Sequence, residues 1–205
     1  PLIAETGGMN AMIVDSTALW EQVSDDILAS AFASAGQRCS ALRVLFVQEE
    51  IAHGLLEMLA GAAANLAIGD PRHLSTDLGP LIDGDAVAAM EAHAERMARE
   101  GKTLFEGALP PGTEGGTFFA PRIFQVADMA IIGGEAFGPI LHVIAYAAHK
   151  LDRVFDDING AGFGLTLGIH SRIDATAAHL HRRLRVGNTY VNRNMIGAVV
   201  GVQPF

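Results

Sequence analysis

Residues 9–48, MNAMIVDSTALWEQVSDDILASAFASAGQRCSALRVLFVQ, decide the fold of this chain. An apolar run at 9–14 predicts a buried strand, and a second apolar run at 43–48 predicts another. The residues between the two runs have the apolar spacing of a helix. A strand, a helix and a second strand form the unit from which parallel sheets are built, so this stretch indicates an α/β fold.

The helix inside this unit has recognisable signals at both ends. Asp15 or Ser16 is expected to cap its start, because a short side-chain oxygen accepts a hydrogen bond from an unpaired backbone N–H. We expect the helix to run to about residue 35, where Gly36 stops it. A short loop would then lead to the second strand.

The rest of the chain continues the alternation of strands and helices. On one helical stretch the apolar residues Val87, Met90, Ala94 and Met97 recur at helical spacing, which predicts a half-exposed helix packed on the core. We therefore expect one α/β body with an open, mostly parallel twisted sheet and helices on both faces. Helices are expected at 49–66, 83–100, 152–159 and 174–184, and strands at 102–106, 118–125, 140–147, 165–170 and 188–191.

Composition and charge exclude several classes of protein. The formal net charge is −9 and the 14 Lys and Arg residues form no run, so nucleic acid is not an expected partner. No apolar stretch approaches the ~20 residues needed to span a bilayer, so no integral membrane segment is expected. The opening PLIAETGG also lacks the order of a secretory signal, which makes the cytoplasm the expected location.

The single cysteine, Cys39, excludes an internal disulfide and a paired-cysteine metal site. The closest histidines, His179 and His181, lie two apart on an expected helix and do not face each other, so we expect no metal site. From composition alone the Cys39 thiol is either a small buried apolar group or a reactive one.

The string around Cys39, FASAGQRCSALRV, resembles the active-site motif of the aldehyde dehydrogenase superfamily. In that motif a glycine, a variable pair and the nucleophilic cysteine follow a helix. The sequence RCSALRV and the last block of the chain are most similar to pyrroline-5-carboxylate dehydrogenases. These include the pyrroline-5-carboxylate dehydrogenase module of bifunctional proline-utilisation proteins. Four further blocks resemble the superfamily in the right order: AETGGMNAMIV at 4–14, IGDPRHLSTDLGPLID at 68–83, GGEAFGPILHV at 133–143 and NTYVNRNMIGAVVGVQPF at 188–205.

The resemblance implies a reaction and two catalytic residues. Cys39 is implied as the nucleophile that attacks an aldehyde, giving an adduct from which hydride passes to NAD and leaves a thioester. Glu5 matches the glutamate that activates water to hydrolyse this thioester. The implied substrate is a small-molecule aldehyde, L-glutamate γ-semialdehyde, which the enzyme oxidises to glutamate in proline catabolism.

The resemblance also implies residues that contact the cofactor. Glu135 matches an acid that holds a ribose hydroxyl, and Phe137 matches a ring that bounds the nicotinamide. Gly7 and Gly8 match a tight glycine pair where backbone or cofactor approaches closely. A capped turn before the strand expected at 140, with Pro139 fixing the bend, and a plain turn at the glycines are the competing structural interpretations.

A carboxylate-bearing substrate needs hydrogen-bond donors. In the semialdehyde branch these donors match the hydroxyl of Ser40 and the backbone of Gly197 and Ala198. Phe205 is a further candidate, for an aromatic wall around the substrate's aliphatic chain. Arg38 is a candidate for a positive potential next to the thiol, although an arginine beside a loop cysteine is as often a surface residue.

No glycine-rich phosphate-binding pattern follows a strand and opens a helix anywhere in the chain. We therefore expect 1–205 to be the thiol-bearing catalytic domain, lacking most of the N-terminal dinucleotide-binding domain that holds NAD. The chain alone is then not expected to oxidise aldehydes, and the full-length protein is expected to form a homo-oligomer.

Three alternatives stay open. A dehydrogenase for another aldehyde, such as succinate semialdehyde, would share Cys39 and Glu5. A non-catalytic packing or oligomerisation module would simply bury its thiol, and a cofactor-independent thiol esterase would use the same nucleophile without nicotinamide. The choice between NAD and NADP is also open.

Overall fold

The computed structural model describes residues 7–198 and residue 202. Within this part of the chain, seven strands form one sheet in the order β3-β4-β5-β2-β1-β6-β7. All neighbouring strands are parallel except β3 and β4, so the predicted open, mostly parallel sheet is confirmed. The strands are β1 (Asn10–Val14), β2 (Leu42–Gln48), β3 (Lys102–Glu106), β4 (Arg122–Gln125), β5 (Ile140–Tyr146), β6 (Thr166–His170) and β7 (Asn188–Val191).

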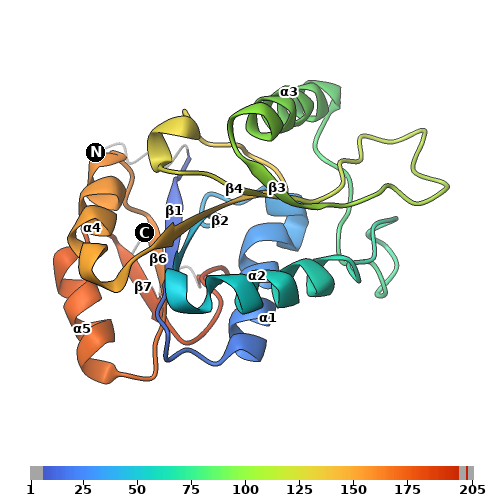
Figure 1. Ribbon diagram of the computed structural model, residues 1–205. Helices are drawn as coiled ribbons and strands as arrows, with labels where there is room; N and C mark the ends of the chain where they lie inside the picture. Colours follow the sequence, from blue (N-terminus) through green and yellow to red (C-terminus); the bar gives the residue numbers. More distant parts are fainter. Residues whose placement is uncertain (1–6, 199–201, 203–205) are drawn as a thin grey trace.

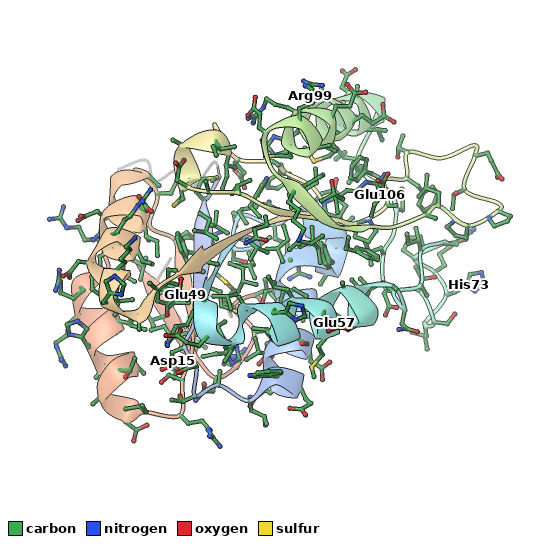
Figure 2. The ribbon with its side chains drawn as sticks, viewed as in Figure 1. Asp15, Glu49, Glu57, His73, Arg99 and Glu106 are labelled. Atoms are coloured by element: carbon green, nitrogen blue, oxygen red, sulfur yellow. The ribbon has the colours of Figure 1, made fainter. Side chains whose placement is uncertain are left out.

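Helices cover both faces of this sheet (Figure 1). The alternation of side chains along β1 assigns its residues to two cores: Met12 packs with α1 and α2, whereas Ile13 packs with α3, α4 and α5. Charged side chains such as Glu57, Arg99 and Glu106 lie on the outside of the body (Figure 2). The helices are α1 (Trp20–Phe32), α2 (Glu49–Ala63), α3 (Gly84–Glu100), α4 (Leu151–Gly160) and α5 (Asp174–Arg183).

The amphipathic helix predicted around Met90 and Met97 is α3. Both methionines are buried in the core, and the Asp83 side chain caps the helix by accepting from the Ala86 N–H at 2.8 Å. The strand predicted at 118–125 is shorter in the structure and begins at Arg122. Pro121 precedes it, and a proline has no N–H to donate to a neighbouring strand.

The predicted start of the first helix is wrong. Helix α1 begins at Trp20, and its N-cap Leu19 makes no side-chain hydrogen bond. Asp15 instead accepts from the N–H and the hydroxyl of Thr17, at 2.7 and 2.6 Å, and from the hydroxyl of Ser171 at 2.5 Å. Asp15 therefore ties the end of β1 to the end of β6 rather than starting a helix.

The end of α1 leads into a tight backbone turn. A 3-10 turn, η1 (Ala33–Gly36), follows the helix, and Ser34, Ala35 and Gly36 all have positive φ, at 57°, 52° and 68°. This turn reverses the chain into residues 37–41, which we call the thiol loop, and then into β2. The predicted end of the helix is therefore wrong: α1 ends at Phe32, three residues before residue 35, because the backbone of Ser34 and Ala35 is not helical.

Among the described residues, no helix is long and apolar enough to cross a membrane. Within 7–198 and at 202, no group of three or more His, Cys, Asp or Glu side chains is arranged to hold a metal ion.

Candidate active site

Cys39 lies in the thiol loop, just before the beginning of β2, and is partly exposed. It is therefore not enclosed in packed hydrocarbon. The parallel strands β1, β2 and β5 begin at the same edge of the sheet, which we call the amino end. The segments that enter these strands are consequently neighbours at this edge.

Asn10, the first residue of β1, holds the thiol loop in place. Its buried amide donates to the carbonyl oxygens of Cys39 and Ala41, at 2.7 and 2.9 Å. Its Oδ1 accepts from the N–H of Thr166, the first residue of β6, at 3.1 Å. The strand register shifts between Asn10 and Ala11, which interrupts the regular backbone pairing of β1 with β2. At this point the Asn10 side chain, rather than its backbone, binds the neighbouring segments.

Gly7 and Gly8 lie between the thiol loop and an acidic side chain. A Cβ on Gly7 would be 2.4 Å from Glu135 Oε2, and a Cβ on Gly8 would be 2.7 Å from the carbonyl oxygen of Cys39. The N–H of Gly8 donates to Glu135 Oε2 at 3.0 Å. The predicted need for close approach at this glycine pair thus has a geometric basis in the structure.

Glu135 and Phe137 belong to residues 133–139, which enter β5 and which we call the cofactor-side loop. The Glu135 carboxylate forms an ion pair with Arg43, with 3.1 Å between Oε1 and Nη2. The Glu135 side chain is 15% exposed and Phe137 is 43% exposed. The acid is therefore held firmly while the ring remains open to a ligand.

Two histidines connect the backbone carbonyl of Arg43 to helix α3. His142 Nδ1 lies 3.0 Å from the Arg43 carbonyl oxygen, and His142 Nε2 lies 2.8 Å from His93 Nε2. The carbonyl accepts only, so His142 carries its proton on Nδ1 and accepts from His93. Burial lowers the pKa of His93 to about 4 and that of His142 to about 3, so both imidazoles are neutral near pH 7.

Residues after β7 return along α1 towards the amino end. The carbonyl of Asn192 accepts from Gln22 at 2.7 Å, and the N–H of Met195 donates to the Ser30 hydroxyl at 3.1 Å. Gln22 lies early and Ser30 lies late in α1, so this segment runs towards the thiol loop. It carries Gly197, whose φ is 80°, in that direction.

Other residues singled out from the sequence have different positions. Ser40 directly follows Cys39 and is buried, and its carbonyl accepts from the Thr166 hydroxyl at 3.3 Å. Arg38 is exposed and uses its guanidinium to bind the Ser34 hydroxyl, at 2.9 and 3.0 Å. Glu5 and Phe205 lie outside the described residues.

The structure thus brings Cys39, the glycine pair and the cofactor-side loop together at one edge. The sequence interpretation missed Asn10 and Arg43, which hold these parts. Arg43 had a detectable signal, since it is a charged residue inside the apolar run at 43–48 and a buried charge needs partners. Asn10 had a weaker one, as an amide inside the buried strand predicted at 9–14.

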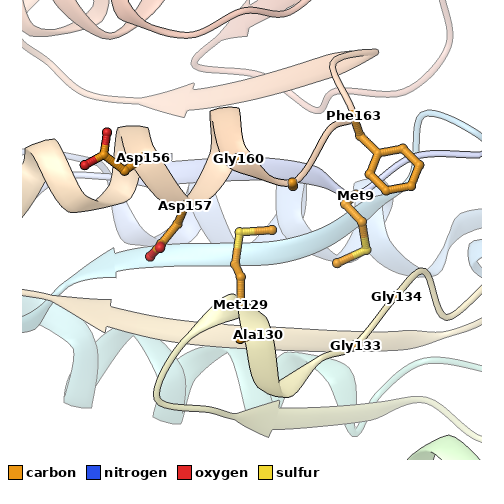
Figure 3. A pocket seen from close by; sticks show the side chains of 10 residues that line it. Met9, Met129, Ala130, Gly133, Gly134, Asp156, Asp157, Gly160 and Phe163 are labelled. Atoms are coloured by element: carbon orange, nitrogen blue, oxygen red, sulfur yellow. The ribbon is translucent and has the colours of Figure 1, made fainter.

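A hollow of about 490 Å³ adjoins the site (Figure 3). Met9, which follows the glycine pair, lines it together with Gly133 and Gly134 of the cofactor-side loop. Asp157 and Phe163 line it from α4 and the segment after α4. The hollow therefore borders the residue after Gly8 and the residue before Glu135.

Comparison with known proteins identifies similar sequences. The model of the aldehyde dehydrogenase family matches residues 1–205. A bifunctional protein PutA from Escherichia coli is 54% identical over all of this chain, which spans 16% of that protein. A 1-pyrroline-5-carboxylate dehydrogenase from Geobacillus kaustophilus is 35% identical, and the chain spans 39% of its length.

Comparison with solved structures agrees. A crystal structure of a bifunctional proline utilization A (PutA) protein has a TM-score of 0.95 and 56% identity, and the alignment covers 100% of this chain and 20% of that one. A 1-pyrroline-5-carboxylate dehydrogenase from Thermus with bound NAD has a TM-score of 0.89 and 34% identity, covering 98% and 38%. The chain thus spans well under half the length of these relatives.

Proposed function

Since the chain belongs to the aldehyde dehydrogenase family, we propose that it carries the catalytic thiol of an NAD-dependent enzyme that oxidises L-glutamate γ-semialdehyde to glutamate. The similarity to PutA proteins and 1-pyrroline-5-carboxylate dehydrogenases supports this substrate. The observation that carries the proposal is the meeting of Cys39, Gly8 and Glu135 at one edge of the sheet.

In the proposed reaction, the Cys39 thiolate forms a carbon–sulfur bond to the aldehyde carbon, and the electron pair of the carbonyl π bond moves to the oxygen, which becomes an oxyanion. Loss of hydride from that carbon oxidises the adduct to a thioester. Water then attacks the thioester carbon, the carbon–sulfur bond breaks, and the products are a carboxylate and the regenerated thiolate. Partial exposure of Cys39 and the fixed thiol loop support its role as the nucleophile.

Glu5 is proposed as the base that takes the proton from the attacking water. This role rests on the match of ETGG, residues 5–8, to the family's motif. The last two residues of the motif, Gly7 and Gly8, contact Glu135 and the Cys39 carbonyl, which supports a position for the motif next to the thiol.

The residues at the amino end fit a dinucleotide on chemical grounds. The missing Cβ atoms of Gly7 and Gly8 let the Glu135 carboxylate and the Cys39 carbonyl approach this segment closely. Glu135 offers a carboxylate to a ribose hydroxyl, and Phe137 offers an exposed ring. When bound, the nicotinamide supplies the acceptor for the hydride. The Thermus relative with bound NAD supports NAD as the cofactor of this chain.

The substrate's own carboxylate is proposed to bind Ser40 and the backbone of Gly197 and Ala198. The return of the 192–195 segment along α1 supports this assignment, because it directs Gly197 towards the thiol loop. Phe205 is proposed as an aromatic wall on the strength of the sequence resemblance alone.

Residues 1–205 are proposed to act as the catalytic domain and to depend on a separate dinucleotide-binding domain for most of the NAD contacts. The larger size of the relatives supports this division, because the chain spans only 16% of one and 39% of another. A homo-oligomeric, cytoplasmic enzyme is the corresponding proposal for the whole protein.

The decisive test uses a polypeptide of the length of the 1-pyrroline-5-carboxylate dehydrogenases that contains this sequence. Formation of NADH from L-glutamate γ-semialdehyde should be readily measured and should fall by about 10⁴-fold or more in Cys39→Ala, because no other group can form the thioester. Equal kcat/KM for succinate semialdehyde would contradict the substrate assignment. Unchanged activity in Cys39→Ala would contradict the mechanism.

The chain by itself allows a second measurement. Alkylation of Cys39 by iodoacetamide at neutral pH should go to completion without denaturant, since the thiol is partly exposed. A thiol that reacts only after unfolding would support the alternative of a non-catalytic packing module.

A further inference from the structure

Arg43 is a fully buried cation in the middle of the site's framework. It occupies the second position of β2, among apolar residues, and its exposed fraction is 0%. Burial lowers the pKa of Arg43, and the adjacent Glu135 carboxylate opposes that shift. A buried charge persists only where its donors find acceptors of suitable geometry.

The guanidinium of Arg43 binds three acceptors in two loops of the site. Its Nε and Nη2 donate to Glu135 Oε1 at 3.3 and 3.1 Å, and its Nη1 donates to the Gly138 carbonyl at 3.1 Å. Its Nη2 also donates to the carbonyl of Arg38, in the thiol loop, at 3.2 Å. The Phe137 ring lies over the same group, with 5.2 Å between Cζ and the ring centroid. One side chain thus joins the thiol loop to the cofactor-side loop.

Bonds from the described residues, 7–198 and 202, occupy all but one of the acceptor positions of Glu135. A carboxylate has about four lone-pair positions. Two N–H groups of Arg43 use Oε1, and the Gly8 N–H uses one position on Oε2. The remaining position is on Oε2, the oxygen that faces Gly7.

We propose that Arg43 is a positioning residue that fixes Glu135 so that Oε2 alone is offered to a ribose hydroxyl of the dinucleotide. This inference rests on the proposed function, because it takes Glu135 to be a cofactor contact. Arg43 does not touch cofactor or substrate; it acts through Glu135.

Arginine suits this position better than lysine would. Its planar fork can donate two bonds to one carboxylate oxygen while two further N–H groups reach carbonyls in the same loop and in the thiol loop. A lysine ammonium is a point charge on a flexible stem, so it would keep the positive charge but lose the alignment. Arg43→Lys therefore separates orientation from charge.

Arg122 provides a matched control. It also pairs with an acid, Glu106, at 3.1 Å, donates to the carbonyls of Gly107 and Ala120, and lies 5.3 Å from the ring centroid of Phe119. It belongs to β4, away from the thiol loop. Arg122 is 19% exposed, so Arg122→Lys shows the effect of replacing the same kind of cluster at a partly exposed position away from the site.

The first experiment measures NAD dissociation constants by calorimetry, in a Cys39→Ala polypeptide of the relatives' length that contains this sequence. We expect Arg43→Lys to weaken NAD binding by about tenfold, and Arg122→Lys to change it by less than about twofold. In a Glu135→Gln background, Arg43→Lys should cause less than about a twofold further change. Additive losses, or unchanged affinity in Arg43→Lys, would overturn the proposal.

A second experiment uses the unaltered 205-residue chain and needs no activity. The Nε–H proton of Arg43 and the N–H of Gly8 should give slowly exchanging NMR signals, since both bind Glu135. Exchange of both at the rate of exposed groups would overturn the proposal even if Arg43→Lys proves too unstable to study. Failure of the unsubstituted longer protein to bind NAD would count against the proposed function instead.

Discussion

Strand β1 has a buried polar side chain at each of its two ends, and the two differ in what they hold. At the amino end, Asn10 holds the backbone of the thiol loop through the carbonyls of Cys39 and Ala41. At the carboxyl end, Asp15 holds only its own turn and the hydroxyl of Ser171. At the amino end of β1 the polar side chain orders the loop that carries the thiol. At the carboxyl end the polar side chain joins the end of β1 to the end of β6.

The difference is instructive because open α/β sheets usually bind ligands outside the carboxyl ends of their strands, where the chain direction switches. Here β1 leads to α1 on one face and β6 leads to α5 on the other, so the switch lies between them. Thr17 and Arg172 close that junction with further bonds, including 2.8 Å from the Arg172 N–H to the Thr17 hydroxyl. The candidate chemistry lies at the opposite edge.

Of the tests of this difference, lowering the pH should have the largest effect on the free energy of unfolding. Burial lowers the pKa of His93 to about 4 and of His142 to about 3 near the amino end, and that of His170 to about 4 at the carboxyl end. The 3.5 Å contact between His170 and Asp26 is therefore not an ion pair near pH 7, because the imidazole is neutral there.

Between about pH 6.5 and pH 4 the unfolded chain binds protons on these histidines and the folded chain does not. The free energy of unfolding should therefore fall with falling pH across this window, by about 2–3 kcal/mol for each of the three histidines. Urea denaturation at several pH values measures it. His142→Gln should reduce the pH dependence of the free energy of unfolding more than His170→Gln does. The reverse order would show that the pKa of the histidine at the carboxyl end is lowered more.

Asn10→Ala should have the next largest effect, at the amino end. It leaves two carbonyls and the Thr166 N–H without partners inside the protein, which should cost about 3–4 kcal/mol. It should also change the rate of Cys39 alkylation, because the thiol loop loses its anchor. A destabilised variant with an unchanged alkylation rate would show that Asn10 supports the fold without ordering the loop.

Gly36→Ala should be slightly milder, at about 3 kcal/mol. Its φ is 68°, and a Cβ would lie 2.3 Å from the carbonyl oxygen of Gly138, so backbone strain and overlap add. Gly162→Ala is the matched control, because its φ is 77° but the space around it is open. That variant should cost about 1 kcal/mol. Equal losses in the two variants would show that the close approach of Gly36 to Gly138 does not contribute to the cost of the substitution.

Asp15→Ala should have the smallest effect, about 2 kcal/mol, through loss of the bonds from Thr17 and Ser171. The Cys39 alkylation rate should stay within about twofold of the unsubstituted chain, because independent, distant sites do not couple. A larger change in that rate would show that the two ends of β1 communicate.

Local sequence patterns predicted the strands and helices well, because apolar periodicity reflects burial on one face. The strands expected at 102–106 and 188–191 agree with β3 and β7 to the residue. The start of α1 was mispredicted because Asp15 had two possible hydrogen-bonding uses. A local cap and a contact with Ser171 compete, and the sequence contains no sign of the distant partner.

The resemblance around Cys39 predicted the family correctly and selected the loops that the structure brings together. It did not predict how these loops are held, since Asn10 and Arg43 act through residues far apart in the chain. Glu135 is 92 positions from Arg43 and 127 positions from Gly8. The assigned roles of individual site residues remain proposals for the experiments above.

The sequence by itself determined the alternation of strands and helices and the family, because both depend on residue types at short spacing. Only the tertiary structure decided which carbonyls Asn10 binds, which oxygen of Glu135 stays free and which end of the sheet is closed. Those outcomes depend on parallel strands bringing distant loops to one edge. A buried donor or acceptor must find its partner there, whatever its distance along the chain.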